Sequence, residues 1–416
     1  MIQTKTNVSI VFRAILLTIG ASFIYAMNSS VRNNYGIMLD SIIDNAGISF
    51  TSISFVLAVG QLMFGLVQPL FGIMAAKKGS LSVLVTGVLL MLAGIILIPF
   101  SKSAFSLMLC LGFILPAGTG ALSYGVIVGA ITPKLPLRAV STVSGIVNAS
   151  IGIGNIVMSP VINSLIKAGG LMQGMMTLSL PALLMLPISI FLGSKAGPIP
   201  EAVGTAPPAQ PQTEKIDIKA LFRTALKSRT YTYLMIGFFT CGFHMALITN
   251  HLPTQFLSFG FSSESAAYAF SIYGFTTIAG SILSGSLSDR FKMKNVLGFF
   301  YALRPLTILA FLILPKTVLV LTIFTALLGF SGAATVPPTA GIINRIYGAK
   351  SIAALFGFVF FIHQIGGFLG AWLGGICFEM TNSYTVMWLA DILLSALAAG
   401  VSFSIKESKA GSCHST

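Results

Sequence analysis

Long apolar stretches, separated by short polar connections, run along the chain from end to end. Each stretch has about 20–28 residues, enough for an α-helix to cross the hydrocarbon core of a membrane. The apolar runs are continuous, whereas the strands of a membrane barrel alternate apolar and polar residues over roughly 10 positions. We therefore expect twelve membrane-spanning helices, at 11–38, 52–76, 80–101, 104–131, 141–166, 171–193, 230–257, 265–288, 295–314, 317–341, 351–377 and 384–405.

The Lys and Arg residues mark the two sides of the expected membrane. Of the 24 Lys and Arg residues, 18 lie in the termini and the even-numbered connections, and Arg13 lies at the start of the first span. Cytoplasmic loops carry an excess of Lys and Arg, so both termini are expected in the cytoplasm, which requires an even number of crossings. We expect a multi-pass membrane protein whose basic loops contact anionic lipids.

The composition excludes several classes of protein. A chain of 416 residues that is 55% hydrophobic and 8% charged is not a soluble globular protein. The net charge of +14 comes without a basic stripe interleaved with aromatic residues, so no nucleic-acid partner is expected. The four cysteines lie far apart without metal-ligand spacing. Phosphate-binding loops, zinc motifs and nucleophile elbows are missing from the sequence, so no cofactor, metal or enzymatic activity is expected.

One connection, residues 194–229, differs from the others in composition. It begins with a Pro-rich spacer and ends in a basic segment, 216–228, whose apolar residues recur at helical spacing. This pattern predicts an amphipathic helix on the inner membrane surface. The linker divides the chain into an N-terminal six-helix bundle at 1–193 and a C-terminal six-helix bundle at 230–416. We therefore expect an all-α membrane protein of two pseudo-symmetric six-helix bundles.

This layout and one loop resemble the major facilitator superfamily. Gly285-Ser-Leu-Ser-Asp289-Arg290, after the eighth span, is similar to the G-x-x-x-D-R loop of that superfamily. The resemblance implies that Asp289 and Arg290 form a latch at the inner ends of helices, which breaks when the two halves rock. The corresponding first-half loop keeps Gly72 but has Ala76 at the carboxylate position.

Three further stretches resemble bacterial relatives of the monocarboxylate transporters. They begin at Arg32 (RNNYG), Val336 (VPPTAG) and His363 (HQIGGFLGAWLGG). The resemblance implies a transporter of small monocarboxylates with a functional cation at the position of Arg32. Animal members carry an Asp and an Arg where this chain has Thr277 and Ser281, so a proton-coupling scheme built on that pair does not transfer.

Arg32 is the first candidate for substrate binding. A charge in the middle of a spanning helix costs roughly 2.5–3.5 kcal/mol on insertion scales, so it normally faces a cavity or a partner. A guanidinium can bind a carboxylate through two parallel hydrogen bonds. In the alternative interpretation, Arg32 extends to the outer headgroups and pairs with Asp40 or Asp44. Spacings of 3, 4 and 3 residues place one polar stripe on this helix: Tyr25, Asn28, Arg32 and Tyr35.

The second half of the chain carries four buried ionisable candidates. Arg304, followed by Pro305, could contact an anion, or it could be held by an ion pair or by backbone carbonyls. Asp391 is the only carboxylate well inside a span, so it is either a proton carrier or the ion-pair partner of Arg304. His244 and His251 lie seven residues apart on one helix face. They could relay protons or donate hydrogen bonds to an anion, or they could be neutral structural histidines.

The eleventh span adds glycines every fourth residue, which favour close helix packing. Further polar residues within spans are candidates for lining the transport pathway: Tyr124, Asn148, His363 and Gln364.

We interpret the sequence as a monomeric secondary transporter that moves a small organic anion, above all a monocarboxylate, by alternating access. H⁺ symport and anion exchange both remain open as coupling modes. The alternative is an exporter of drug-like or metal-chelating compounds on the same scaffold. An intramembrane enzyme would need a nucleophile–base pair or a metal cluster, and the sequence offers neither.

Overall fold

The computed structural model describes residues 2–135, 140–194, 218–347 and 352–407, and these residues form helices joined by short turns, without a strand among them. The first half comprises α1 (Ile2–Asn33), α2 (Tyr35–Ala46), α3 (Phe50–Lys78), α4 (Ser80–Leu97), η1 (Ile98–Phe100), α5 (Ala104–Leu107), η2 (Met108–Ile114), α6 (Leu115–Ala121), α7 (Tyr124–Ile131), η3 (Thr132–Lys134) and α8 (Val140–Gly193).

The second half begins with the short amphipathic helix α9 (Ile218–Lys227), which falls inside the segment 216–228 expected to form one. Residues 195–217 of the predicted linker lie outside the described residues. The other elements are α10 (Arg229–Ala246), η6 (Leu247–His251), α11 (Leu252–Ser258), α12 (Ser263–Arg290), α13 (Met293–Ile313), α14 (Val318–Gly332), η7 (Ala333–Thr335), α15 (Val336–Tyr347), α16 (Ile352–Thr381) and α17 (Thr385–Phe403).

Eleven helical stretches among the described residues are long and apolar enough to cross a membrane. The longest, Gly145–Gly193, has 49 residues and is interrupted at Gly169 and Gly170. Gly170 has a φ of 68°, which is favourable for a residue without a Cβ. Ile166 lies beside Gly174, with its Cγ1 2.9 Å from where a Cβ would stand, so the chain doubles back here. Counting the two arms separately gives the twelve predicted spans.

The first, fourth, seventh and tenth spans are broken rather than continuous. Asn34 separates α1 from α2, and Leu122 and Ser123 separate α6 from α7. The seventh span passes through the π-helix η6, and the tenth through the 3₁₀-helix η7. The first predicted span, 11–38, therefore has the wrong outer boundary, because the helix stops at Asn33 and resumes as α2 as far as Ala46. Breaks inside a membrane free backbone groups that other polar groups must satisfy.

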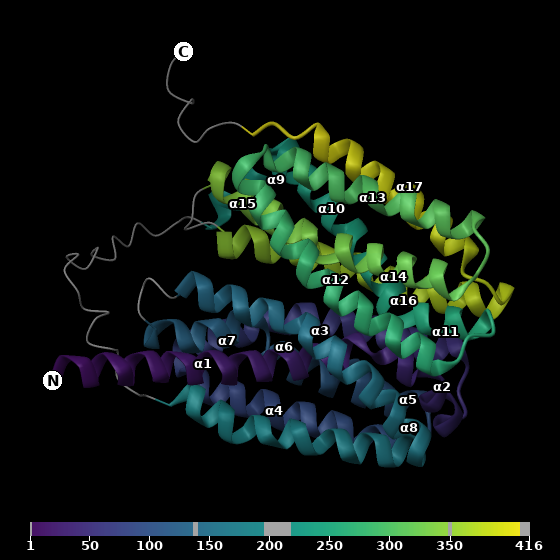
Figure 1. The fold of residues 1–416 in the computed structure, drawn as a ribbon, viewed down its shortest axis with the longest axis horizontal. Coiled ribbons are helices and arrows are strands. Elements are labelled where there is room, and N and C mark those ends of the chain that lie inside the picture. The colour runs from purple at the N-terminus through teal and green to yellow at the C-terminus, as the bar shows by residue number, and fades with distance from the viewer. Residues whose placement is uncertain (1, 136–139, 195–217, 348–351, 408–416) are drawn as a thin grey trace.

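The two halves of the chain lie one above the other, with their helices roughly parallel (Figure 1). We call the face that bears Gly79, Phe291 and Ile405 the terminal face, and the opposite face, which bears α2, the α2 face. At the α2 face the halves touch: the rings of Phe50 and Phe378 lie 5.0 Å apart. The backbone N–H of Thr51 donates to Glu379 Oε2 at 2.8 Å there.

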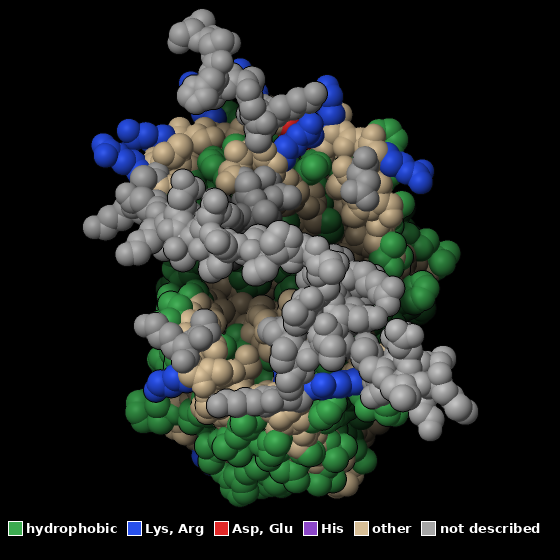
Figure 2. Space-filling model, turned by 90° about the vertical axis from the view of Figure 1, so that its left-hand side faces the viewer, with side chains coloured by type: hydrophobic (Ala, Val, Ile, Leu, Met, Phe, Trp, Pro, Cys, Tyr) green, Lys and Arg blue, Asp and Glu red, His purple; other side chains and the backbone are tan. Residues whose placement is uncertain are grey.

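Toward the terminal face the halves separate. Four glycines near that face, on α3, α8, α12 and α16, have open space where a Cβ would stand: Gly72, Gly145, Gly285 and Gly357. Four glycines of the same helices nearer the α2 face lie against the opposite half: Gly65, Gly152, Gly274 and Gly367. Figure 2 views the terminal face, where Lys and Arg side chains stand around a surface that is hollowed between the halves. The molecule is thus closed at the α2 face and open at the terminal face.

Candidate functional site

Arg32 ends α1 and lies between aromatic side chains of both halves. Its guanidinium carbon stands 4.1 Å from the centroid of the Phe64 ring on α3, a cation–π contact. Three phenol groups are near enough to interact electrostatically with its charge: Tyr25, Tyr35 and Tyr273. Arg32 is half-buried, and no carboxylate of the described residues lies within ion-pairing distance of it. The alternative pairing with Asp40 or Asp44 is not seen among the described residues.

Some of the other predicted residues of the first half lie near Arg32, and one lies at the break of the fourth span. Tyr35 is buried, and the ring of Tyr25 packs on that of Tyr124 at 5.6 Å. Asn28 Nδ2 donates to the carbonyls of Thr119 and Leu122, at 3.1 and 3.0 Å. These carbonyls lie at the break of the fourth span, so the amide N–H groups of Asn28 satisfy backbone groups there. The role of Asn28 in substrate binding stays a prediction.

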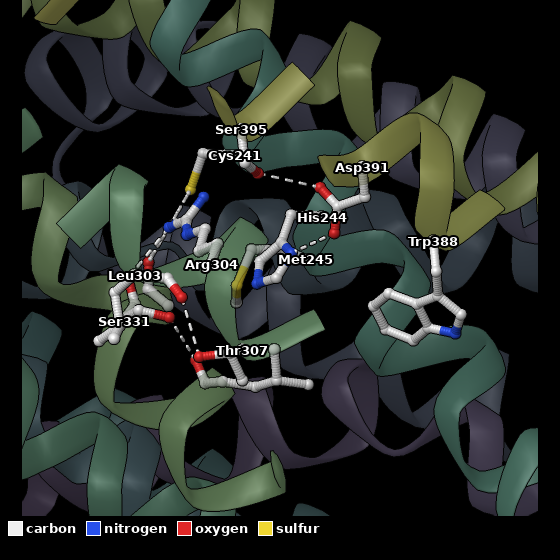
Figure 3. A network of polar contacts seen from close by, with 12 residues as sticks. Cys241, His244, Met245, Leu303, Arg304, Thr307, Ser331, Trp388, Asp391 and Ser395 are labelled. Atoms are coloured by element: carbon white, nitrogen blue, oxygen red, sulfur yellow. Dashed lines mark hydrogen bonds and ion pairs between the residues drawn. The ribbon is translucent and has the colours of Figure 1, made fainter. Parts of the chain in front are cut away.

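Arg304 is fully buried and holds the break of the tenth span. Its Nη2 donates to the carbonyls of Ser331 and Gly332 at 3.0 Å each, and to the Cys241 thiol at 3.5 Å (Figure 3). The chain leaves the α-helix at Gly332, directly before the Val336-Pro-Pro segment. The structure therefore places Arg304 on backbone carbonyls. Its role in anion binding stays a prediction, with these contacts against it.

Asp391 pairs with His244 rather than with Arg304. His244 Nδ1 lies 2.5 Å from Asp391 Oδ2, and both side chains are sealed from solvent. The other oxygen of Asp391 accepts a hydrogen bond from Ser395 Oγ at 3.2 Å. Figure 3 shows the imidazole of His244 beside Arg304 on its other side. A histidine, a carboxyl group and a guanidinium thus share one buried cluster between α10, α13 and α17.

His251 lies seven residues after His244, about two helical turns further along the seventh span, and is part of the closed α2 face. Its Nε2 lies 2.8 Å from the Ala371 carbonyl and its Nδ1 3.3 Å from the Tyr384 hydroxyl. The Phe50 ring of the other half lies 5.9 Å from the imidazole. Both ring nitrogens have partners, so the structure gives His251 a place in packing between the halves.

The eleventh span contributes one polar contact between the halves. Gln364 is fully buried and its Oε1 accepts from Gln61 Nε2 on α3 at 2.6 Å. His363 is half-buried, stacks on Phe360 at 5.2 Å, and has no hydrogen-bond partner at Nδ1. Gln364 therefore lies at the interface of the two halves, whereas the His363 ring packs on residues of the second half. Their place in the pathway stays a prediction.

The structure shows few contacts for the remaining predicted residues. Asn148 is half-buried on α8. Arg290 is exposed at the end of α12 and forms no ion pair within the described part of the chain. The side chain of Asp289 lies outside what the structure describes, so the predicted latch stays a prediction. Among the described residues, no group of three metal-ligating side chains is present.

Comparison with known proteins decides the family. A family model described as Major Facilitator Superfamily matches residues 20–262 and 234–412. This chain belongs to the major facilitator superfamily. It is 26% identical over 391 residues to the uncharacterized MFS-type transporter YcxA of Bacillus subtilis (strain 168), covering 91% of this chain and 92% of the relative. It is 26% identical over 354 residues to monocarboxylate transporter 12 of Homo sapiens, covering 77% and 67%.

Solved structures show the same fold. A bacterial homolog of the human lysosomal transporter Spinster, solved in an inward-facing and unoccupied conformation, superposes with a TM-score of 0.74 at 15% identity, over 94% of this chain and 97% of that one. The predicted resemblance is confirmed: this major facilitator protein is related to the monocarboxylate porter family. It thus belongs to a family of transporters, not of enzymes.

Sequence reasoning missed three residues of this major facilitator site. Gln61 is a polar residue inside an apolar span, a signal equal to that of Gln364. Phe64 and Tyr273 carried no signal, because an aromatic residue in a membrane helix is ordinary. Only the fold brings Phe64 from α3 and Tyr273 from α12 to Arg32.

Proposed function

We propose that this protein is a secondary transporter of a small organic anion, above all a monocarboxylate, that works by alternating access. Arg32 supplies the cation that binds the carboxylate. Tyr25, Tyr35 and Tyr273 supply hydroxyl groups around it. The transport couples the anion to H⁺ or exchanges it for a second anion, and the chain works as a monomer without a cofactor.

One observation carries this proposal: Arg32 is a half-buried cation without a carboxylate partner among the described residues. Phe64 covers one face of the guanidinium, which leaves the N–H groups at its edge for a ligand. A carboxylate fits that edge through two parallel hydrogen bonds. Tyr25 and Tyr35 come from the first half and Tyr273 from the second, so an anion here would be shared by both halves, as alternating access requires.

The orientation completes the proposal. We propose that the terminal face lies in the cytoplasm and that the protein resides in the inner membrane of a bacterial cell. The Lys and Arg residues at the terminal face support this orientation. The conformation seen here would then be open to the cytoplasm and closed to the outside.

Arg32→Ala tests the binding site directly. Purified protein in proteoliposomes is assayed for uptake of labelled lactate and pyruvate, and thermal shift is measured over a panel of small carboxylates. Each charge-assisted hydrogen bond contributes about 1.5–3 kcal/mol, so the loss of two should weaken binding at least about 100-fold. Arg32→Lys keeps the positive charge but lacks the planar guanidinium, so its affinity should lie between that of the parent protein and that of Arg32→Ala.

Arg13→Ala is the matched control. It removes an arginine from the same helix, 19 residues earlier by its number, and should leave uptake and thermal shift unchanged. If Arg32→Ala transports small acids as well as the parent protein, the proposed role of Arg32 is wrong. Stabilisation by bulky drug-like or chelating compounds, without any response to small carboxylates, would favour the exporter instead.

A further inference from the structure

In the buried pair of His244 and Asp391, one ring nitrogen has no hydrogen-bond partner. An ionised carboxylate only accepts hydrogen bonds, so His244 Nδ1, 2.5 Å from Asp391 Oδ2, carries the proton between them. The lone pair of the neutral imidazole is then on Nε2. That atom is buried and has no hydrogen-bond partner. A buried polar atom without a partner is rare in native structures and calls for an explanation.

The charges around His244 explain why Nε2 is left free. His244 contacts Asp391 (α17), whose charge interacts with that of Arg304 (α13). Arg304 in turn contacts Tyr301 and the thiol of Cys241 (α10). His363 (α16) and Tyr273 (α12) interact electrostatically with Cys241. Arg304 is permanently protonated, and Asp391 is the only carboxylate in this set. With Asp391 ionised and the Cys241 thiol protonated, the two charges cancel, so the sealed cluster is neutral while His244 is neutral. One proton added to Nε2 makes it a cation.

We propose that His244 Nε2 is the atom that binds the coupled proton, and that it does so when an anion occupies Arg32. This inference rests on the proposed function and specifies H⁺ symport rather than anion exchange. Tyr273 lies within electrostatic range of both Arg32 and Arg304, and its hydroxyl lies 3.3 Å from the sulfur of Met245, the residue after His244. An uncompensated charge in a low-dielectric interior is costly, and the positive potential of Arg32 opposes a second cation nearby.

A carboxylate at Arg32 removes that opposing potential, so binding of the anion favours binding of the proton, and the reverse follows by linkage. The empty carrier and the carrier loaded with anion plus proton then have the same net charge. The carrier loaded with the anion alone differs from both by one unit. The pair is sealed in the conformation seen here, so the proton enters and leaves in a conformation that opens it.

The first test needs no transport. The chain has four histidines, and ¹⁵N-histidine labelling with His244→Gln as the assignment variant identifies the signals of His244. With pyruvate present, we expect Nε2 to pass into the imidazolium range between about pH 8 and pH 4, at a higher pH than without pyruvate. A His244 that keeps one unprotonated nitrogen over that whole range, with and without pyruvate, overturns the proposal.

The second test separates coupling from binding. In proteoliposomes, His244→Gln should retain counterflow of labelled pyruvate within about threefold of the parent protein, while its accumulation driven by a pH gradient falls to the equilibrium ratio. Asp391→Asn should behave likewise. Ser402→Ala is the control, because it removes another buried hydroxyl of α17 that bonds only to the Ala398 carbonyl of its own helix.

His244→Gln that still accumulates pyruvate under a pH gradient like the parent protein contradicts the inference and leaves the proposed function intact. Loss of the proposed function has a different signature, since Arg32→Ala would then retain both counterflow and accumulation.

Discussion

The side chains of Gln61 and Gln364 meet across the two halves of the molecule, with Gln61 Nε2 donating to Gln364 Oε1 at 2.6 Å. Gln61 lies on α3 and Gln364 on α16, the pair of helices that also brings Gly65 against the Gln364 side chain. This hydrogen bond joins the two halves in the conformation seen here, and we expect it to break when the α2 face opens. It therefore stabilises the conformation seen here relative to one in which the halves have rocked apart.

Gln61→Ala should shift the equilibrium away from this conformation. The change leaves Gln364 Oε1 buried without a donor, which costs about 1–3 kcal/mol, or roughly a tenfold change in population. Spin labels at Ala168 and Ser263, on the two halves at the α2 face, would report longer distances. Gln68→Ala is the control, since Gln68 Nε2 bonds only to the Phe64 carbonyl of its own helix. Unchanged distance distributions in Gln61→Ala would contradict the assignment.

Substitution of two glycines of α8 by tryptophan should affect the distance between the spin labels in different ways. A Cβ at Gly152 would lie 2.6 Å from the Gly274 carbonyl oxygen, so Gly152→Trp should force the α2 face open. Gly145 has open space beside it and should admit a tryptophan in the present conformation, but not when the terminal face closes. The same label pair should lengthen in Gly152→Trp and stay short in Gly145→Trp, and both variants should lose transport. A common response of the two variants would argue against rocking of rigid halves.

Phe64→Leu should weaken anion binding without abolishing it. The phenyl ring holds one face of the Arg32 guanidinium by a cation–π contact, and such a contact contributes about 1 kcal/mol or somewhat more, so affinity should fall roughly fivefold. Isothermal titration with the preferred acid measures the change. Phe71→Leu, on the same helix but without a contact to Arg32, should bind normally; equal affinity in both variants would remove Phe64 from the site.

Arg304→Leu should lower stability rather than affinity. Removing the guanidinium leaves the carbonyls of Ser331 and Gly332 without their donor and Asp391 without a compensating charge. Loss of one partner of a buried charge costs about 3–5 kcal/mol. The apparent melting temperature in detergent should therefore fall well below that of Arg32→Ala. A variant of normal stability that no longer binds small acids would instead return Arg304 to the substrate site.

The sequence by itself determined the membrane class, the number of spans and the superfamily. Continuous apolar runs can only be helices in a membrane, because every backbone group must be satisfied within the segment. Arg32 also stood out by sequence alone, since a charge within an apolar span needs a reason.

The tertiary structure decided which polar residues satisfy backbone groups of neighbouring helices. Asn28, Arg32 and Arg304 are alike in sequence, as polar residues in apolar helices, yet Asn28 and Arg304 satisfy carbonyls at broken helices and Arg32 does not. Likewise, only the fold pairs Asp391 with His244, 147 residues apart. In spans that are apolar on every side, periodicity does not fix the rotation of a helix. The partner of each polar group is therefore set by how the helices pack.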